Sequence, residues 1–371
     1  MGDRVEGCFG NPVQLRCCRM TDISTGPVPY VYVCTRMRVR KSKLIPREDY
    51  LRLLNMSIPE ITRFIEETQY KREIDELASS FHGIDLIELA LSWNLAKEYQ
   101  NIQDITPGVL KRFTQSYLRK WDIQNILTIF RGKIQGMKPG KIREILVPAG
   151  EMDRVFLDRL VKEDSPERIL EALKGQSVYP VIAEGFGTAI GEESFAKVEN
   201  ELYKQFYANL LSEAMSGLKG GKQFLEYIML DIDITNIRNI FRLRADRLHE
   251  DARSMMIPGG TFSTDEFQQL ISIEDTKEFI DTLKSKVHLK PLLMLLEEMS
   301  VGEKSLREIE IDLIKVQLAQ MESLTKLNPF SIHPILTYLE KKKYEVFNLR
   351  AIARGKEVNL PTDRIRRYLV M

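Results

Sequence analysis

Asp122-Ile123-Gln124-Asn125-Ile126-Leu127-Thr128-Ile129-Phe130-Arg131 is the stretch that decides the fold, because the chain contains it three times in diverged form. The second copy runs from Asp233 to Arg242, and the third runs from Glu345 to Arg354. All three fit the pattern acid, aliphatic, any, Asn, aliphatic, any, any, Ile, any, Arg. The distance from the first copy to the second is almost the same as the distance from the second to the third.

Two other landmarks repeat in the same phase. A Glu-x-x-Leu pattern begins at Glu88, Glu199 and Glu310, which are evenly spaced. A helix-breaking segment, Val147-Pro-Ala-Gly150, recurs as Ile257-Pro-Gly-Gly260, whereas the end of the chain has neither Pro nor Gly at the third place. Repetition at one fixed period predicts three homologous units of about 110 residues.

The repeated stretches predict helices. Ile123, Ile126, Leu127 and Phe130 fall on one side at the helical period of 3.6 residues. Ser165-Pro-Glu and Ser57-Ile-Pro-Glu are typical helix starts, with serine as N-cap and proline in the first turn. Alternating strand patterns are rare, and we interpret residues 30–34 as the beginning of a helix. The predicted fold class is therefore all-α.

These observations predict three helical lobes, at 29–152, 153–262 and 263–371. Residues 1–28 lie outside the repeat and are expected to be a disordered arm or an over-called start of translation. Units of about 110 residues are too long for an ordinary solenoid. We therefore expect the lobes to pack around a pseudo-threefold axis, with an opening at the centre.

Composition excludes several classes of protein. The 371 residues include 54 Lys and Arg against 53 Asp and Glu, and a net charge of +1 gives no signal for nucleic acid. Hydrophobic residues make up 43%, enough for packed cores. All four cysteines lie between Cys8 and Cys34, near the N-terminus, which indicates a reducing compartment. No run of about 18 apolar residues predicts a transmembrane helix.

Motifs for catalysis or cofactor binding are incomplete. Gly185-Phe-Gly187 lacks the third glycine of a dinucleotide fingerprint, and we expect a loop between helices there. Gly220-Gly221-Lys222 lacks the first glycine and the Ser or Thr of a P-loop, and predicts a turn between helices. The four histidines do not form an i, i+4 pair of the kind that holds zinc. The sequence therefore predicts no catalytic residue, metal site or cofactor.

The polar residues of the repeated motif are the main candidate residues. They could bind a partner, or they could satisfy buried backbone groups and connect the lobes. We favour the second interpretation, because a residue present in every lobe serves either the fold or a threefold site. The candidates are Asp122, Asn125, Arg131, Asp233, Asn236, Arg242, Glu345, Asn348 and Arg354.

One basic cluster lies near the start of the first lobe. It contains Arg36, Arg38, Arg40, Lys41 and Lys43. A solvated helix end paired with acids is the favoured interpretation. The alternative is a surface that faces anionic lipid headgroups, where each basic residue contributes about 1 kcal/mol.

The motifs as a set resemble one known family. Beside the three repeated stretches and Val147-Pro-Ala-Gly150, the matching segments are Tyr32 to Arg38, Leu53 to Met56, and Ile61-x-x-Phe-Ile-Glu-Glu-x-x-Tyr70. Over about residues 30–371 the chain resembles the C subunit of the archaeal-type (V/A-type) rotary ATP synthase, the counterpart of the d subunit of the eukaryotic V-ATPase. The resemblance implies three helical lobes around a pseudo-threefold axis that form a funnel.

The resemblance also implies a function. The protein would be a non-catalytic rotor subunit on the cytoplasmic face of the membrane. It would join the central shaft, made by subunits D and F, to the proteolipid ring and transmit torque between them. It would bind no nucleotide, nucleic acid or ion, and it would be monomeric when isolated.

Several features depart from this pattern or leave alternatives open. The arm before residue 29 is outside the family pattern, and the third copy has Glu345 and Ala353 in place of Asp and Phe. The second has Leu243 where the others have Gly132 and Gly355. One alternative is a helical scaffold outside the ATPase. Another is an enzyme with a triplicated helical domain, which predicts a deep polar pocket with perturbed carboxylates or a histidine.

Overall fold

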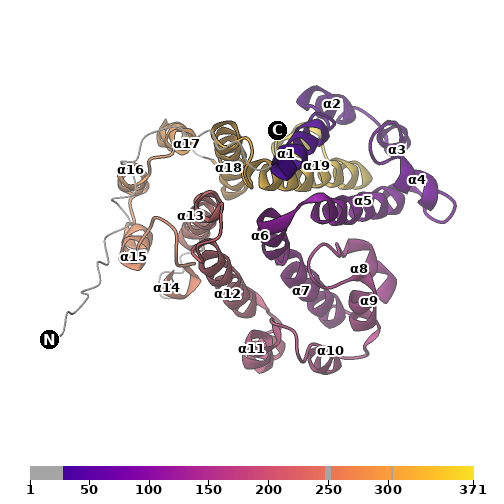
Figure 1. Ribbon diagram of the computed structural model, residues 1–371, viewed down its shortest axis with the longest axis horizontal. Helices are drawn as coiled ribbons and strands as arrows, with labels where there is room; N and C mark the ends of the chain where they lie inside the picture. Colours follow the sequence, from indigo (N-terminus) through magenta and orange to yellow (C-terminus); the bar gives the residue numbers. More distant parts are fainter. Residues whose placement is uncertain (1–27, 247–251, 302–303) are drawn as a thin grey trace.

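The computed structural model describes residues 28–246, 252–301 and 304–371 (Figure 1). Within these ranges every regular element is a helix, so the all-α prediction is confirmed. The expected arm at 1–28 lies outside the described residues, except for its last residue, which begins the first helix.

The helices repeat in one order, which defines three helix sets. Each set has three short helices, a long helix, a second long helix and a short final helix. The first set is α2 (Arg47–Leu53), α3 (Ile58–Glu66), α4 (Lys71–Leu77), α5 (Gly83–Ile105), α6 (Gly108–Leu118) with α7 (Lys120–Ile134), and α8 (Pro139–Ile145). The second is α9 (Arg154–Lys162), α10 (Pro166–Ala172), α11 (Tyr179–Gly191), α12 (Ala196–Ala214), α13 (Gly221–Ala245) and α14 (Ala252–Met255). The third is α15 (Thr264–Ser272), α16 (Thr276–Lys286), α17 (Lys290–Val301), α18 (Leu306–Leu327), α19 (His333–Glu357) and α20 (Thr362–Arg367).

One described helix has no counterpart in this order. Helix α1 (Val28–Lys41) precedes the first set and packs against α19 of the third. The predicted helix start at residues 30–34 is confirmed. The second long helix is continuous in α13 and α19, whereas in the first set it is divided into α6 and α7 at Arg119.

Local sequence signals explain where the helices begin. The Oγ of Ser165 accepts from the backbone N–H of Arg168 and caps α10, as its Ser-Pro-Glu sequence predicts. At the start of α3, the carboxylate of Glu60 accepts from the backbone N–H of Ser57 at 2.8 Å, in a capping box. Capping satisfies N–H groups that have no partner within the first helical turn.

The expected loop at Gly185-Phe-Gly187 is wrong. Both glycines lie inside α11, which packs against α12. A Cβ atom on Gly185 would lie 2.5 Å from Cγ2 of Val198, so this glycine permits two helices to approach closely. The predicted turn at Gly220 is confirmed: its φ of 88° is in the left-handed region, and α13 begins at the next residue.

The helix sets contact one another in cyclic order. The first long helix of each set packs against the second long helix of the set before it: α12 on α7, α18 on α13, and α5 on α19. The last of these contacts joins the third set to the first. Figure 1 shows the long helices converging on the middle of the molecule, with the short helices around the outside.

Candidate functional site

The three motif asparagines hold the chain segments that follow their helices. Asn125 donates from Nδ2 to the carbonyl of Val147 at 2.7 Å, and its Oδ1 accepts from the N–H of the same residue at 2.9 Å. Asn236 makes the same two bonds with Ile257, at 2.8 and 2.9 Å. A peptide group leaving a helix into a packed interior needs such partners, because an unpaired buried N–H or C=O costs about 1–3 kcal/mol.

The third asparagine makes this contact at the end of the chain. Asn348 donates to the carbonyl of Val370 at 2.7 Å and accepts from its N–H at 2.8 Å. All three asparagines are almost fully buried. The motif Asn residues therefore bind this chain's own backbone in each helix set.

The motif acids bind the segment that begins the next helix set. Asp122 accepts from the backbone N–H groups of Glu151 and Met152, at 2.8 and 3.0 Å. Asp233 accepts from the N–H and the hydroxyl of Thr261, at 2.7 and 2.8 Å. Burial raises the pKa of both carboxyls to about 6, and the donated hydrogen bonds offset only part of this effect.

Glu345, the third motif acid, makes the corresponding backbone hydrogen bond between the third helix set and the first. It accepts from the N–H of Ile45, before α2, at 2.6 Å. It also accepts from the Tyr70 hydroxyl at 2.6 Å and from the buried Lys342 ammonium at 2.9 Å. The third carboxylate therefore bonds the segment that begins the first set.

Close approach to these acids explains the repeated glycines. A Cβ atom on Gly150 would lie 2.2 Å from a carboxylate oxygen of Asp122, and one on Gly260 would lie 2.3 Å from Oδ1 of Asp233. Residues 368–371, at the corresponding place in the third copy, contain no glycine. Gly132 has a different function, since a Cβ there would lie 2.8 Å from the side chain of Ile142 in α8.

The motif arginines form ion pairs with the Glu-x-x-Leu glutamates of the next set. Arg131 pairs with Glu199, Arg242 with Glu310, and Arg354 with Glu88. The order is cyclic, because the third arginine binds the first glutamate. The arginine side chains are about half exposed, so each pair contributes only about 0–1 kcal/mol. The pairs therefore specify which helices are neighbours more than they stabilise the fold.

A buried polar cluster joins all three helix sets at the centre. The hydroxyl of Tyr117 in α6 contacts the hydroxyl of Tyr227 in α13 and donates to Glu340 of α19 at 2.6 Å. The ammonium of Lys120 bonds Glu340 and Tyr117, and Lys343 pairs with the second oxygen of Glu340. Each of these side chains except Lys343 is buried.

Two lysines keep the buried carboxyl of Glu340 ionised. Burial opposes ionisation of Glu340, but Lys120 and Lys343 outweigh it and hold its pKa well below the ordinary value. Nearby, Asp231 accepts from Tyr207 at 2.8 Å and from Gln317 at 2.6 Å. Because the cluster takes side chains from all three sets, the sets are in contact at this level.

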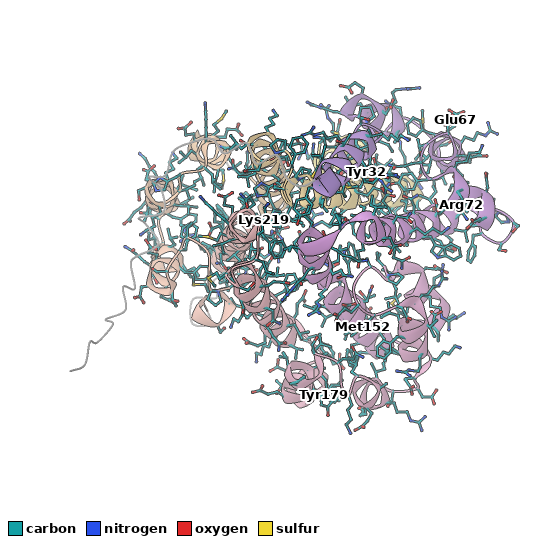
Figure 2. The ribbon with its side chains drawn as sticks, viewed as in Figure 1. Tyr32, Glu67, Arg72, Met152, Tyr179 and Lys219 are labelled. Atoms are coloured by element: carbon teal, nitrogen blue, oxygen red, sulfur yellow. The ribbon has the colours of Figure 1, made fainter. Side chains whose placement is uncertain are left out.

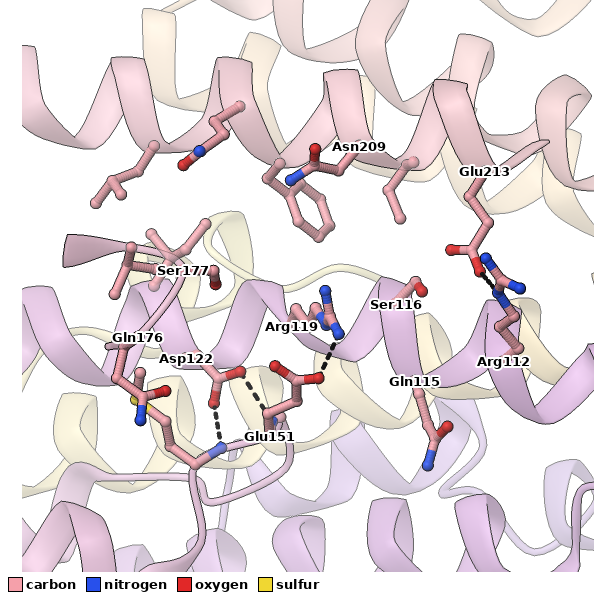
Figure 3. A pocket seen from close by; sticks show the side chains of 18 of the residues that line it. Arg112, Gln115, Ser116, Arg119, Asp122, Glu151, Gln176, Ser177, Asn209 and Glu213 are labelled. Atoms are coloured by element: carbon pink, nitrogen blue, oxygen red, sulfur yellow. Dashed lines mark hydrogen bonds and ion pairs between the residues drawn. The ribbon is translucent and has the colours of Figure 1, made fainter. Parts of the chain in front are cut away.

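A polar groove of about 650 Å³ lies between α12 and the pair α6–α7. Figure 3 shows Asn209 on α12 facing Asp122 and Ser116 across it, with Arg112–Glu213 and Arg119–Glu151 ion pairs along its length. Both Asp122 oxygens are bonded to backbone N–H groups at the wall of the groove. The carboxyl of Asp122, whose pKa is raised, is thus engaged in hydrogen bonds to the chain's own backbone.

The basic cluster of α1 divides into two parts. Arg40 pairs with Glu98, and Lys41 pairs with Glu322 at 2.9 Å. Arg36, Arg38 and Lys43 are exposed, and none of them pairs with a carboxylate within the described residues. The favoured interpretation, pairing with acids, therefore describes two of the five side chains.

Sequence reasoning missed the central cluster and the partners of the arginines. Tyr117 and Tyr227 are separated by about one repeat, which is a signal of the common ancestry of the sets, but Lys120 and Glu340 have no equivalents with the same charge in each set. The described residues contain no group of three or more His, Cys, Asp or Glu side chains able to hold a metal ion. In those ranges no helix is both long enough and apolar enough to cross a membrane.

Comparison with known proteins gives one consistent result. The family model described as ATP synthase (C/AC39) subunit matches residues 33–368. The chain is 38% identical over 347 residues to the A-type ATP synthase C subunit of Methanococcoides burtonii, covering 92% of this chain and 94% of that protein. It is 35% identical over 343 residues to the protein of the same name from Archaeoglobus fulgidus, covering 92% and 96%. For the Halobacterium salinarum protein the values are 34% over 355 residues, 94% and 99%.

Proposed function

Because the chain belongs to the ATP synthase (C/AC39) subunit family, we propose that it is a non-catalytic central-stalk subunit of a rotary ATP synthase. In this role it joins the shaft, made by subunits D and F, to the proteolipid ring and transmits torque between them. It is peripheral to the membrane, on the cytoplasmic face. The observation that best supports this role is the cyclic set of contacts that links the end of the chain to its beginning.

A torque-bearing adaptor must resist shear between its parts. The acid and Arg contacts recur at each junction between helix sets, and the third junction is closed by Glu345–Ile45 and Arg354–Glu88. The central cluster adds a buried connection among all three sets. Close-packed interiors have low compressibility and transmit strain. A closed ring of helix sets therefore moves as one body when the shaft and the proteolipid ring apply force to it.

The same contacts support the arrangement of lobes inferred from the repeat. We propose that the three helix sets surround a pseudo-threefold axis that passes through the central cluster. The lobes then begin at about residues 45, 152 and 261, where each motif acid binds the backbone, and α1 lies outside the repeat. Away from the cluster the lobes separate into a funnel that receives the shaft.

We propose that the groove between α12 and α6–α7 is a binding site for a polar surface of a partner protein. Gln115, Ser116, Asn209 and Ser212 line it, and none of them has a side-chain hydrogen bond within the described residues. Polar groups that lie unpaired at a concave junction can bond an incoming polar surface without breaking existing bonds. Figure 2 labels Met152, which lines the groove, and Tyr179, the first residue of α11.

Affinity purification tests the assignment. Tagged full-length chain is recovered from detergent-solubilised membranes of the source cell and its partners are identified by mass spectrometry, with an unrelated tagged protein as control. We expect the proteolipid, subunits D and F and the catalytic head. A folded chain that recovers none of them would favour the alternative of a scaffold outside the ATPase.

A matched pair of variants tests the groove. Asn209→Trp fills it, whereas Ala208→Trp places the same ring on the preceding residue of α12, which is exposed and does not line the groove. We expect Asn209→Trp to reduce recovery of the partners and to uncouple ATP hydrolysis from ion movement, with Ala208→Trp close to wild type. Equal effects of the two variants would contradict the proposal that the groove binds a partner.

A further inference from the structure

Helix α1 is the described helix that the repeat does not explain. Its inner face packs against α19 through the buried Val33, Cys34 and Met37, which hold it on the surface of the third set. A helix present once in a threefold arrangement can recognise something that meets the molecule on one side only. Its outer face is therefore the place to look for a contact that the motif residues do not make.

The outer face of α1 has an apolar centre and basic edges. Val31, Tyr32 and Val39 are 37%, 54% and 53% exposed. At about 100° per residue these three fall on one side of the helix together with the exposed Thr35, with Arg38 along one edge of the stripe and Arg36 along the other. An apolar stripe with basic side chains on both sides is typical of a helix that lies in a membrane interface.

The charge of this face is entirely positive. The α1 sequence, VPYVYVCTRMRVRK, contains no acidic residue. Arg36 donates to the Tyr32 hydroxyl at 2.7 Å, and Arg38 donates to the Pro329 carbonyl at 3.3 Å, so each is oriented but neither is neutralised. Close to Pro329 in the chain, the exposed Lys326 and Leu327 add one basic and one apolar group at the end of α18.

We propose that the outer face of α1, with Lys43 and with Lys326 and Leu327 at the end of α18, binds the headgroup surface of an anionic phospholipid bilayer. Arginine and lysine bind phosphate, while valine, tyrosine and leucine gain from burial at the boundary of the acyl region. The inner face stays packed on α19, so the contact is made on the surface and needs no unfolding. That a bilayer lies beside this face in the cell rests on the proposed function.

Vesicle flotation of the purified full-length chain tests this proposal. The vesicles contain either phosphatidylcholine alone or one part phosphatidylglycerol to two parts phosphatidylcholine. We expect binding to the anionic vesicles that weakens with salt, and little binding to the neutral ones. Failure of the wild-type chain to bind anionic vesicles would overturn the proposal.

Charge-matched variants identify the surface. Arg36→Gln/Arg38→Gln/Lys43→Gln should weaken binding to anionic vesicles roughly a hundredfold, because each basic residue contributes about fivefold. Lys138→Gln/Lys162→Gln/Lys174→Gln removes three exposed charges from other parts of the chain and should change binding less than about threefold. Tyr32→Ser/Val39→Ser should also weaken binding, with unchanged circular dichroism. Equal losses in both charge variants would show general electrostatic attraction and overturn the assignment to α1.

The result is separable from the proposed function. A chain that recovers the ATPase subunits from membranes but does not bind anionic vesicles refutes only the lipid contact. A chain that binds the vesicles through α1 but recovers no ATPase subunit refutes only the central-stalk role.

Discussion

Substitution of Asn236 tests whether the repeated motif is structural. The side chain is fully buried, and its amide makes both hydrogen bonds available to the peptide group of Ile257. Asn236→Ala removes both and leaves a buried N–H and a buried C=O without their partner. At about 1–3 kcal/mol for each of the two unpaired groups, the free energy of unfolding should fall by about 2–6 kcal/mol.

Asn239, three residues later in α13, is the matched control. It is half-buried and donates one hydrogen bond, to the carbonyl of Met255 at 3.2 Å. Asn239→Ala should lower the free energy of unfolding by about 0.5–1.5 kcal/mol. Both variants remove an amide from the same helix, so the difference between them isolates the paired contact with Ile257.

Urea unfolding followed by circular dichroism measures the loss, and hydrogen exchange of the peptide that contains Ile257 locates it. We expect faster exchange at this segment in Asn236→Ala and little change there in Asn239→Ala. Similar stability in the two variants would refute the reasoning. An Asn236→Ala chain with wild-type stability that failed to recover its partners would show that the motif binds a partner instead.

Three further predictions follow from the contacts between helix sets. Asp122→Asn should lower the free energy of unfolding by about 1–3 kcal/mol, because the new NH₂ group would face one of two backbone N–H donors. Asp233→Asn should change it by less than about 1 kcal/mol, because the Thr261 hydroxyl can accept from the new amide. Urea unfolding of both variants at pH 7 measures the two losses, and a larger loss in Asp233→Asn would contradict this reasoning. Since the pKa of Asp233 is raised to about 6 in the folded chain, its stabilising contribution is full below about pH 4 and is lost as pH rises through 6. Between pH 4 and 7 the free energy of unfolding of the wild type should therefore fall by up to about 3 kcal/mol relative to that of Asp233→Asn. A difference between the two proteins that does not change with pH would refute the raised pKa. Glu340→Gln should lower the free energy of unfolding by about 3–5 kcal/mol, because it leaves Lys120 and Lys343 without their carboxylate partner. Glu199→Gln, in the half-exposed pair with Arg131, should lower it by less than about 1 kcal/mol. Equal losses in thermal or urea unfolding would show that the central cluster stabilises the fold no more than an exposed ion pair does.

The structure accommodates the residues that differ between the three copies of the repeat. Glu345 replaces aspartate where the acid must bond Ile45, a residue at the other end of the chain. Gly355, like Gly132, permits a following helix to approach, since a Cβ there would lie 2.6 Å from Ile365 of α20. Leu243 at the same place in the second set is buried.

The sequence by itself determined the helical class, the three-part repeat and the positions of helix starts such as Ser57 and Ser165. These features depend on local interactions, namely the period of apolar residues and the capping of the first turn, which are legible in a few neighbouring residues. The family resemblance was legible for the same reason, because its motifs are short and their spacing is constant.

Only the tertiary structure decided which side chains meet. Arg131 and Glu199 were both visible as members of repeated patterns, but their pairing depends on α12 packing against α7. The cluster of Tyr117, Lys120 and Glu340 unites residues from distant parts of the chain, and no local signal specifies such a contact. The partners of a buried charge are chosen by how helices pack, and packing is a property of the whole chain.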